Sequence, residues 1–159
     1  MKHVNIYTYS SLKSPKAAET LNAAAGYILE FMTEKGPCTR TQTFLLCNIA
    51  NEMTANQSNL VILEKALARM NIKCELDIWT DSQHIASAFE QGWAKAWILN
   101  GWKTANNQEI AHKKEWQQLI KQIQGNVVRF HVKEDHEYRS WLMNEVEHER
   151  AFVERQETI

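Results

Sequence analysis

Asp81 is the acidic residue of this chain whose surroundings best suit metal chemistry. It follows an apolar segment that ends in Trp79-Thr80, and it precedes Ser82-Gln83, where a helical pattern begins. A hard cation such as Mg2+ prefers oxygen ligands, and a carboxylate supplies both an oxygen and a neutralising charge. We therefore expect any metal chemistry in the chain to depend on Asp81 and on the groups that the fold brings to it.

The bulk composition describes a globular chain without a strong overall charge. Its 159 residues, 44% of them hydrophobic, are enough to bury a core, and we expect one domain over residues 1–159. The net charge of −1 supplies no global basic field of the kind that attracts nucleic acid. From Glu134 to the end, acids outnumber bases, so that end is expected to repel phosphates unless a metal intervenes.

Cysteine usage and hydropathy indicate where the protein works. Cys38, Cys47 and Cys74 are widely spaced and odd in number, which favours free thiols in a reducing compartment over a disulfide framework. The N-terminus lacks the apolar core of a signal peptide, and no apolar run is long enough to span a bilayer. We therefore expect a cytoplasmic protein with no membrane partner.

Hydrophobic periodicity predicts an α/β fold. An antiparallel meander comes first, and a helix that Pro15 could open lies between its first two strands. The meander strands are expected at Val4–Thr8, Tyr27–Thr33 and Thr39–Ile49. The later elements are expected to be a helix at Asn56–Met70, a strand at Lys73–Thr80, helices at Gln83–Asn100 and Ile110–Ile123, a strand at Asn126–Val132 and a helix at Leu142–Val153. The order β-β-β-α-β-α-α-β-α implies a mixed five-stranded sheet with helices on both faces.

Several motifs occur in the order and spacing of the type 1 ribonucleases H. Trp79-Thr80-Asp81-Ser82-Gln83-His84 resembles that family's Thr-Asp-Ser-Gln-Tyr segment, and Gly101-Trp102-Lys103-Thr104 resembles its Gly-Trp-Lys-Thr turn. Ile6-Tyr7-Thr8-Tyr9-Ser10-Ser11 and Thr54-Ala55-Asn56-Gln57-Ser58-Asn59-Leu60 resemble two further segments. The resemblance spans nearly the whole chain. It implies a ribonuclease H-like fold, and enzymes of this family cut the RNA strand of an RNA–DNA hybrid with two bound Mg2+ ions.

The resemblance also implies four metal-binding carboxylates, of which this chain keeps Asp81. The first position holds Tyr9 and the second holds Asn59, and the fourth falls on Asn144 or, after a shift of one residue, on Glu145. A phenol and an amide cannot neutralise two divalent ions. We therefore expect metal to bind weakly or not at all at Asp81.

The family's nucleic-acid contacts are kept in part. The resemblance implies that Thr54 holds a DNA phosphate, that Asn56 and Gln83 face the minor groove, and that Trp102 and Lys103 complete the nucleic-acid-binding set. Small polar groups of this kind read shape and 2′-hydroxyls rather than base sequence. The clustered Lys/Arg that many bacterial members carry between the tryptophan motifs is replaced by Trp97-Ile98-Leu99-Asn100-Gly101. Ile98 and Leu99 could instead form a partner-binding surface.

His136 follows Lys133-Glu134-Asp135 and resembles a mobile His that aids product release in the family. The glycines that surround that His in the family are absent here, and the alternative is an inert surface His. Acids that could replace lost metal ligands are Glu52, Glu64, Glu134 and Asp135.

These observations support three hypotheses about function. The first is a catalytically impaired or inactive ribonuclease H-like protein that needs no cofactor and binds RNA–DNA hybrid, another nucleic acid or a protein partner. The second is an active but atypical hybrid endonuclease, in which Asp81 and Glu145 or another recruited acid hold Mg2+ or Mn2+. The third is a protein-interaction module, such as a homodimer formed through Ile98 and Leu99 or through the last helix.

Overall fold

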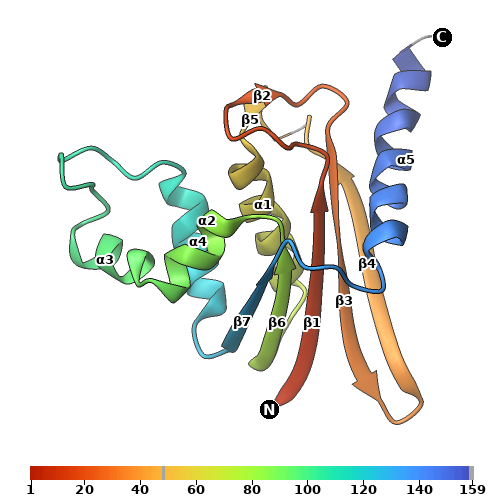
Figure 1. Cartoon of the computed structure of the whole chain (residues 1–159), viewed down its shortest axis with the longest axis horizontal. Helices are drawn as coiled ribbons and strands as arrows, with labels where there is room; N and C mark the ends of the chain where they lie inside the picture. Colours follow the sequence, from red (N-terminus) through yellow and green to blue (C-terminus); the bar gives the residue numbers. More distant parts are fainter. Residues whose placement is uncertain (48, 158–159) are drawn as a thin grey trace.

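The computed structural model describes residues 1–47 and 49–157 and contains a twisted five-stranded sheet (Figure 1). The sheet order is β4-β3-β1-β6-β7, in which β1 pairs antiparallel with β3 and parallel with β6. Its strands are β1 (Lys2–Ser10), β3 (Ala24–Thr33), β4 (Gly36–Leu45), β6 (Cys74–Thr80) and β7 (Val127–Val132). The predicted mixed sheet and its antiparallel meander are therefore confirmed.

Helices cover both faces of the sheet (Figure 1). Helices α1 (Ala55–Ala68) and α4 (Lys113–Ile123) pack together over one face, and α5 (Arg139–Glu157) lies on the other, against β1, β3 and β4. The shorter helices α2 (Gln83–Glu90) and α3 (Trp93–Leu99) follow β6. Among the described residues, no helix is both long enough and apolar enough to cross a membrane.

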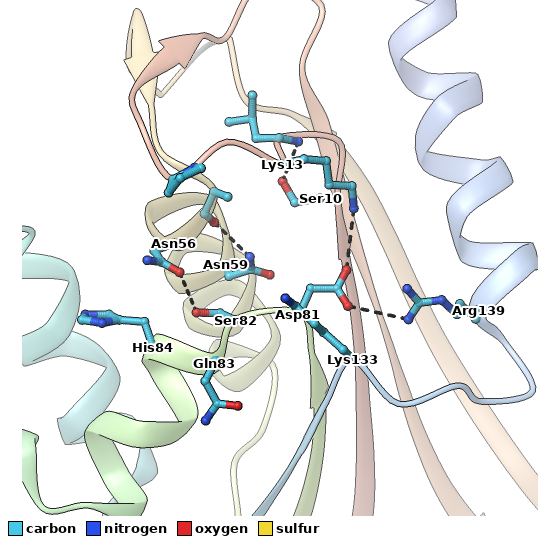
Figure 2. A pocket seen from close by; sticks show the side chains of 13 residues that line it. Ser10, Lys13, Asn56, Asn59, Asp81, Ser82, Gln83, His84, Lys133 and Arg139 are labelled. Carbon is cyan, nitrogen blue, oxygen red and sulfur yellow. Dashed lines mark hydrogen bonds and ion pairs between the residues drawn. The ribbon is translucent and has the colours of Figure 1, made fainter.

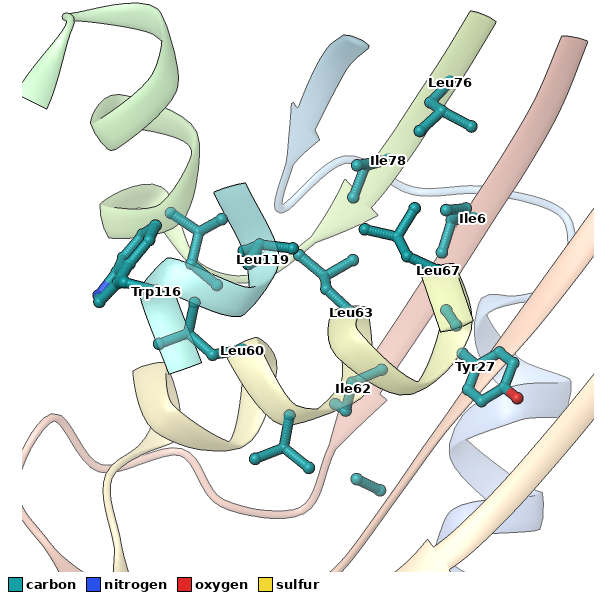
Figure 3. Close-up of a cluster of buried hydrophobic side chains, with 14 of the residues drawn as sticks. Ile6, Tyr27, Leu60, Ile62, Leu63, Leu67, Leu76, Ile78, Trp116 and Leu119 are labelled. Carbon is teal, nitrogen blue, oxygen red and sulfur yellow. The ribbon is translucent and has the colours of Figure 1, made fainter. Parts of the chain in front are cut away.

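Two apolar clusters hold these layers together. The larger cluster joins the sheet to α1 and α4 through fully buried side chains that include Ile6, Leu63, Ile78 and Leu119 (Figure 3). The smaller cluster joins the opposite face to α5, and its members are Tyr7, Tyr9, Ala24, Ile28, Leu142 and Val146. Because successive residues of β1 point to opposite faces, Tyr9 belongs to the α5 side and is 9% exposed.

Two predicted helices differ from the structure. The segment Gln83–Asn100 forms two helices, because Gly92 adopts a positive φ of 77° that interrupts the helical backbone. The connection after β1 contains no helix at Pro15. It contains instead the two-residue strand β2 (Ala18–Glu19). This strand pairs with β5 (Glu52–Met53), which immediately precedes α1 in the chain.

The third predicted strand, Thr39–Ile49, also has different bounds. It begins earlier, at Gly36, and ends at Leu45, after which the backbone N–H of Ile49 donates to the carbonyl oxygen of Leu46 in a turn. Residue 48 of that prediction lies outside the described residues.

Candidate functional site

A cleft of about 690 Å3 opens at the carboxyl ends of β1 and β6 (Figure 2). The two strands run parallel and side by side, so their ends bring Ser10 and Asp81 to one edge of the sheet. The cleft is lined by Ser10, Leu12, Lys13, Pro15, Ala55, Asn56, Asn59, Asp81, Ser82, Gln83, His84, Lys133 and Arg139. This lining contains one carboxylate, which belongs to Asp81, and the cationic side chains of two lysines and one arginine.

Helix starts fix one wall of the cleft. Thr54 caps α1 by accepting a hydrogen bond of 3.0 Å from the backbone N–H of Gln57, and Ser82 caps α2 by accepting one of 3.2 Å from Ile85. The Ser82 hydroxyl also donates to Oδ1 of Asn56 at 2.8 Å, which ties the two helix starts together. The wall is therefore held by polar contacts that do not involve Asp81.

Asp81 lies between two cations. One carboxylate oxygen is 3.6 Å from Nζ of Lys13, and the other is 3.6 Å from a guanidinium nitrogen of Arg139 (Figure 2). Lys13 reaches this position from the β1–β2 connection, and Arg139 is the first residue of α5. The Asp81 side chain is 28% exposed. Its charge is thus balanced by protein groups rather than left for a metal ion.

Tyr9 supports one of these cations. The ammonium of Lys13 lies 4.0 Å from the centroid of the Tyr9 ring, within the range of a cation–π contact. Burial of the phenol, together with the nearby carboxylates of Glu147 and Asp81, raises its pKa above the usual value. The phenol is therefore neutral at physiological pH, and its ring occupies the space beneath Lys13.

Asn59 contributes a neutral amide, rather than a carboxylate, to the lining of the cleft. The side chain is buried, and its Nδ2 donates to the carbonyl oxygen of Ala55, one turn earlier in α1, at 2.9 Å. Nearby, the hydroxyls of Ser10 and Ser58 hydrogen-bond at 2.7 Å. The two positions where the resemblance implies acids are therefore occupied by neutral groups with partners of their own.

Neither candidate for the fourth acid lines the cleft. Glu145 borders a different hollow, which it shares with Thr43, His148, Glu149 and Phe152, and Asn144 is exposed on α5. The α5 carboxylate that acts on Tyr9 belongs to Glu147, which Arg150 holds at 2.7 Å. Among the side chains that the structure describes, no three from His, Cys, Asp or Glu group in a way that could hold a metal ion. The donor set thus does not fit two Mg2+ ions.

His136 lies outside the cleft as well. Its ring packs 4.4 Å from that of Tyr7 and 5.6 Å from that of Trp79, and its Nδ1 accepts a hydrogen bond from the backbone of Tyr138. Burial and the nearby Arg139 lower its pKa, which favours the neutral imidazole. The structure therefore gives His136 a packing role on the sheet.

The structure brings together some of the predicted nucleic-acid-binding residues. Asn56 and Gln83 line the cleft, and Thr54 is the adjacent helix cap. Trp102 and Lys103 lie apart from the cleft, beyond α3. The centroid of the Trp102 ring lies 6.2 Å from that of Trp97, and the backbone of Lys103 pairs with that of Glu109 in an isolated antiparallel β-bridge.

Two apolar side chains at the end of α3 are exposed to solvent. Ile98 is 48% exposed and Leu99 is 84% exposed, and nothing in the described part of the chain covers them. The predicted partner surface therefore exists as an exposed patch, without an indication of what would bind there.

Sequence reasoning did not single out Lys13, Lys133 or Arg139 as a group. The three residues come from separate connections, and no spacing rule joins positions that are this far apart. The available signal was the absence of carboxylates at positions 9 and 59, which argues against bound metal ions that would repel cations at this edge of the sheet.

A comparison with protein families settles the ancestry of this arrangement, because the RNase H family model matches residues 1–140. The chain belongs to the RNase H family. Its RNase H relatives include the Ribonuclease H of Acetivibrio thermocellus, 37% identical over 68 residues that cover 43% of this chain and 46% of that protein. The Ribonuclease H of Chlorobaculum parvum is 31% identical over 83 residues, which cover 52% of this chain and 57% of that protein. The chain thus spans about half the length of the curated relatives that it matches.

Solved RNase H structures share the fold. LC9-RNase H1, described as a type 1 RNase H with the type 2 active-site motif, superposes with a TM-score of 0.69 at 18% identity, covering 91% of this chain and 70% of that one. LC11-RNase H1 in complex with RNA/DNA hybrid superposes with a TM-score of 0.53 at 17% identity, covering 90% and 95%. At these identities the likeness establishes the α/β RNase H-like fold.

Proposed function

We propose that this RNase H-family chain binds nucleic acid, specifically RNA–DNA hybrid, without cleaving it. The observation that carries the proposal is the state of Asp81, the one retained acid, whose two oxygens face Lys13 and Arg139. The neighbouring positions that the resemblance assigns to acids are held by Tyr9 and Asn59. A site with one carboxylate and several cations suits an anion better than a divalent cation.

Electrostatics supports the absence of catalysis. Two-metal cleavage needs a pair of ions that clamp the attacking and leaving oxygens, and carboxylates must offset their charge. A Mg2+ ion placed beside Asp81 would lie within a few ångströms of both Lys13 and Arg139, where repulsion of like charges is strong in a partly enclosed cleft. The parts of such a centre act as a unit, so loss of several ligands is not compensated by one that remains.

The choice of hybrid as ligand rests on the family and on the wall of the cleft. LC11-RNase H1 has been solved in complex with RNA/DNA hybrid, and so has a foamy viral protease-reverse transcriptase in which the fold of this chain matches 20% of the length. In this chain the amides of Asn56 and Gln83 line the cleft, and the buried hydroxyl of Ser82 holds the Asn56 amide in place. Such groups suit contacts to sugars and 2′-hydroxyls in a minor groove.

A cleavage assay tests the proposal. The wild-type chain and Asp81→Asn are incubated with a labelled RNA–DNA hybrid in Mg2+ and, separately, in Mn2+. We expect no cleavage above a protein-free control in either metal, and no difference between the two proteins. Multiple turnover by the wild type that Asp81→Asn abolishes would show an active endonuclease and overturn the proposal.

A binding assay supplies the other half of the test. We expect the protein to raise the fluorescence anisotropy of a labelled hybrid. The affinity should fall as the salt concentration rises, because phosphate contacts release counterions. Absence of binding to hybrid at low salt would also overturn the proposal.

A further inference from the structure

We propose that Lys13, Lys133 and Arg139 bind a backbone phosphate of the nucleic acid directly, at the place where other members of the family hold metal ions. This inference rests on the proposed function and goes one step beyond it. Protein cations replace the metal as the phosphate-binding element, so binding does not require a divalent ion.

The three cations converge on one cleft from three parts of the chain. Lys13 comes from the β1–β2 connection, Lys133 from the segment after β7, and Arg139 from the start of α5 (Figure 2). Lys133 adopts a positive φ of 54°, and its backbone N–H donates to the carbonyl oxygen of Thr80 at 3.0 Å, which fixes its backbone next to Asp81. The fold therefore assembles these charges through backbone contacts as well as through side chains.

Most N–H donors of these three side chains are not engaged in short hydrogen bonds. Both ion pairs to Asp81 measure 3.6 Å, whereas a fully formed charge-assisted hydrogen bond measures about 2.7–2.9 Å. An ammonium carries three donors and a guanidinium carries five. In the described part of the chain, the side chain of Lys133 has no ion-pair partner. A phosphate that enters the cleft thus finds donors that a single carboxylate does not saturate.

The charge balance of the cleft favours an anion. Its lining holds one carboxylate and three cationic side chains, a net charge of +2, and the nearby carboxylate of Glu147, which also acts on Lys13, is paired with Arg150. A phosphodiester carries one negative charge, and interactions in a partly enclosed cleft are screened less by salt than those on an open surface. The chain's overall charge of −1 makes this concentration of positive charge local to the cleft.

Tyr9 and Asp81 hold the cations in position. The ring of Tyr9 lies 4.0 Å below the ammonium of Lys13, and Asp81 draws Lys13 and Arg139 toward each other. Without a ligand, the Asp81 carboxylate offsets the repulsion between these two cations. A bound phosphate takes over that role, so Asp81 then competes with the phosphate for the same donors.

The first experiment measures hybrid affinity in EDTA and in Mg2+ by fluorescence anisotropy. We expect the wild type to bind in EDTA at least as tightly as in Mg2+ at matched ionic strength, because Mg2+ competes with protein cations for phosphates. We expect Lys13→Gln and Arg139→Gln each to weaken binding about tenfold, the effect of losing one charge-assisted hydrogen bond, and to reduce the salt slope by about 1. Arg139→Lys, which keeps the charge, should retain most of the affinity.

The matched control is Lys35→Gln, which removes the same charge at the exposed turn between β3 and β4 (Figure 1). That turn lies at the opposite end of the sheet from the cleft, so this variant should bind as the wild type does. Thermal melts of all variants separate loss of binding from loss of folding.

Asp81→Asn provides the decisive comparison. Direct phosphate binding predicts that this variant binds hybrid several-fold more tightly, because the competing carboxylate is gone. A metal-dependent site predicts the reverse, with binding that requires Mg2+ and falls in the variant. The second result would overturn the inference.

Two further outcomes separate this inference from the proposed function. Hybrid binding that is unchanged in Lys13→Gln and Arg139→Gln would overturn the phosphate site and leave non-catalytic hybrid binding standing. A second result would also overturn binding of a backbone phosphate at this site. In that result, inorganic phosphate perturbs the NMR signals of these residues, but the substitutions leave the affinity for hybrid unchanged, so the cleft binds free phosphate only. Cleavage that depends on Asp81 would overturn the proposed function itself.

Discussion

Asp77 and Asp81 lie four residues apart on and just after the same strand, β6, yet their surroundings differ sharply. Asp77 is 9% exposed, and its two oxygens contact His3, His131 at 2.7 Å and Arg129 at 3.1 Å. Burial alone would raise the pKa of Asp77, but hydrogen bonds from His131, His3 and Arg129 outweigh it and lower the pKa to about 2. This carboxylate is fully committed to the fold.

Asp81 is more exposed, at 28%, and its two partners stay at 3.6 Å. The cationic side chains around Asp81 outnumber its single negative charge, whereas the hydrogen-bond donors around Asp77 are all bonded to its carboxylate. The contrast teaches that a carboxylate's partners, rather than its presence alone, separate a structural role from a binding role.

The largest expected difference is in stability. Asp77→Asn should lower the free energy of unfolding by about 2 kcal/mol, because it removes the negative charge and leaves one accepting oxygen for three polar partners. Asp81→Asn should change it by less than about 0.5 kcal/mol, as expected for a loosely paired, partly exposed group. Urea denaturation of both variants at pH 7 makes the comparison, and similar losses in the two would remove the contrast.

A smaller effect is expected in the pH dependence of the free energy of unfolding at acidic pH. The pKa of Asp77 falls from 3.8 to about 2 on folding, so its contribution is present above pH 4 and is lost as the pH falls toward 2. The loss should approach 2 kcal/mol over that window. The measurement is the difference in unfolding free energy between wild type and Asp77→Asn from pH 5 to 2.5, which should shrink as the pH falls. A pH-independent difference would assign the effect to packing.

The smallest effect concerns pairwise coupling. A double-mutant cycle between Asp77 and His131 should give about 1 kcal/mol, since the pair is close and largely buried. The corresponding cycle between Asp81 and Lys13 should give less than about 0.5 kcal/mol. A larger coupling for Lys13 would mean that the cation is spent on Asp81 and unavailable to a ligand.

The fold was largely predictable because its elements carry local signals. Leu60, Leu63 and Leu67 recur at helical spacing, and the helix predicted at Asn56–Met70 is observed at Ala55–Ala68. Gly92 carried the signal that separates α2 from α3, and the prediction passed over it. At Pro15, pairing of β2 with β5 took precedence over a weak helical preference.

The candidate site was predictable only as far as its single positions. Asp81 and the neutral side chains at positions 9 and 59 can be identified from the residues, and the structure places all three at one edge of the sheet. The pairing of Asp81 with Lys13 and Arg139 cannot, because it depends on how a connection and a helix start pack across the sheet. The same limitation explains Glu145, whose position on α5 depends on which helix face packs against β1 and β3.

The ring of Tyr9 beneath Lys13 has a consequence for the reversibility of this state. An aspartate at position 9 would meet the ammonium of Lys13 and form a salt bridge with it, so a single reversion would restore an acid without restoring a ligand. The ammonium must leave before the acid becomes useful, and Arg139 blocks Asp81 in the same way. A return to metal chemistry thus requires several mutations rather than one.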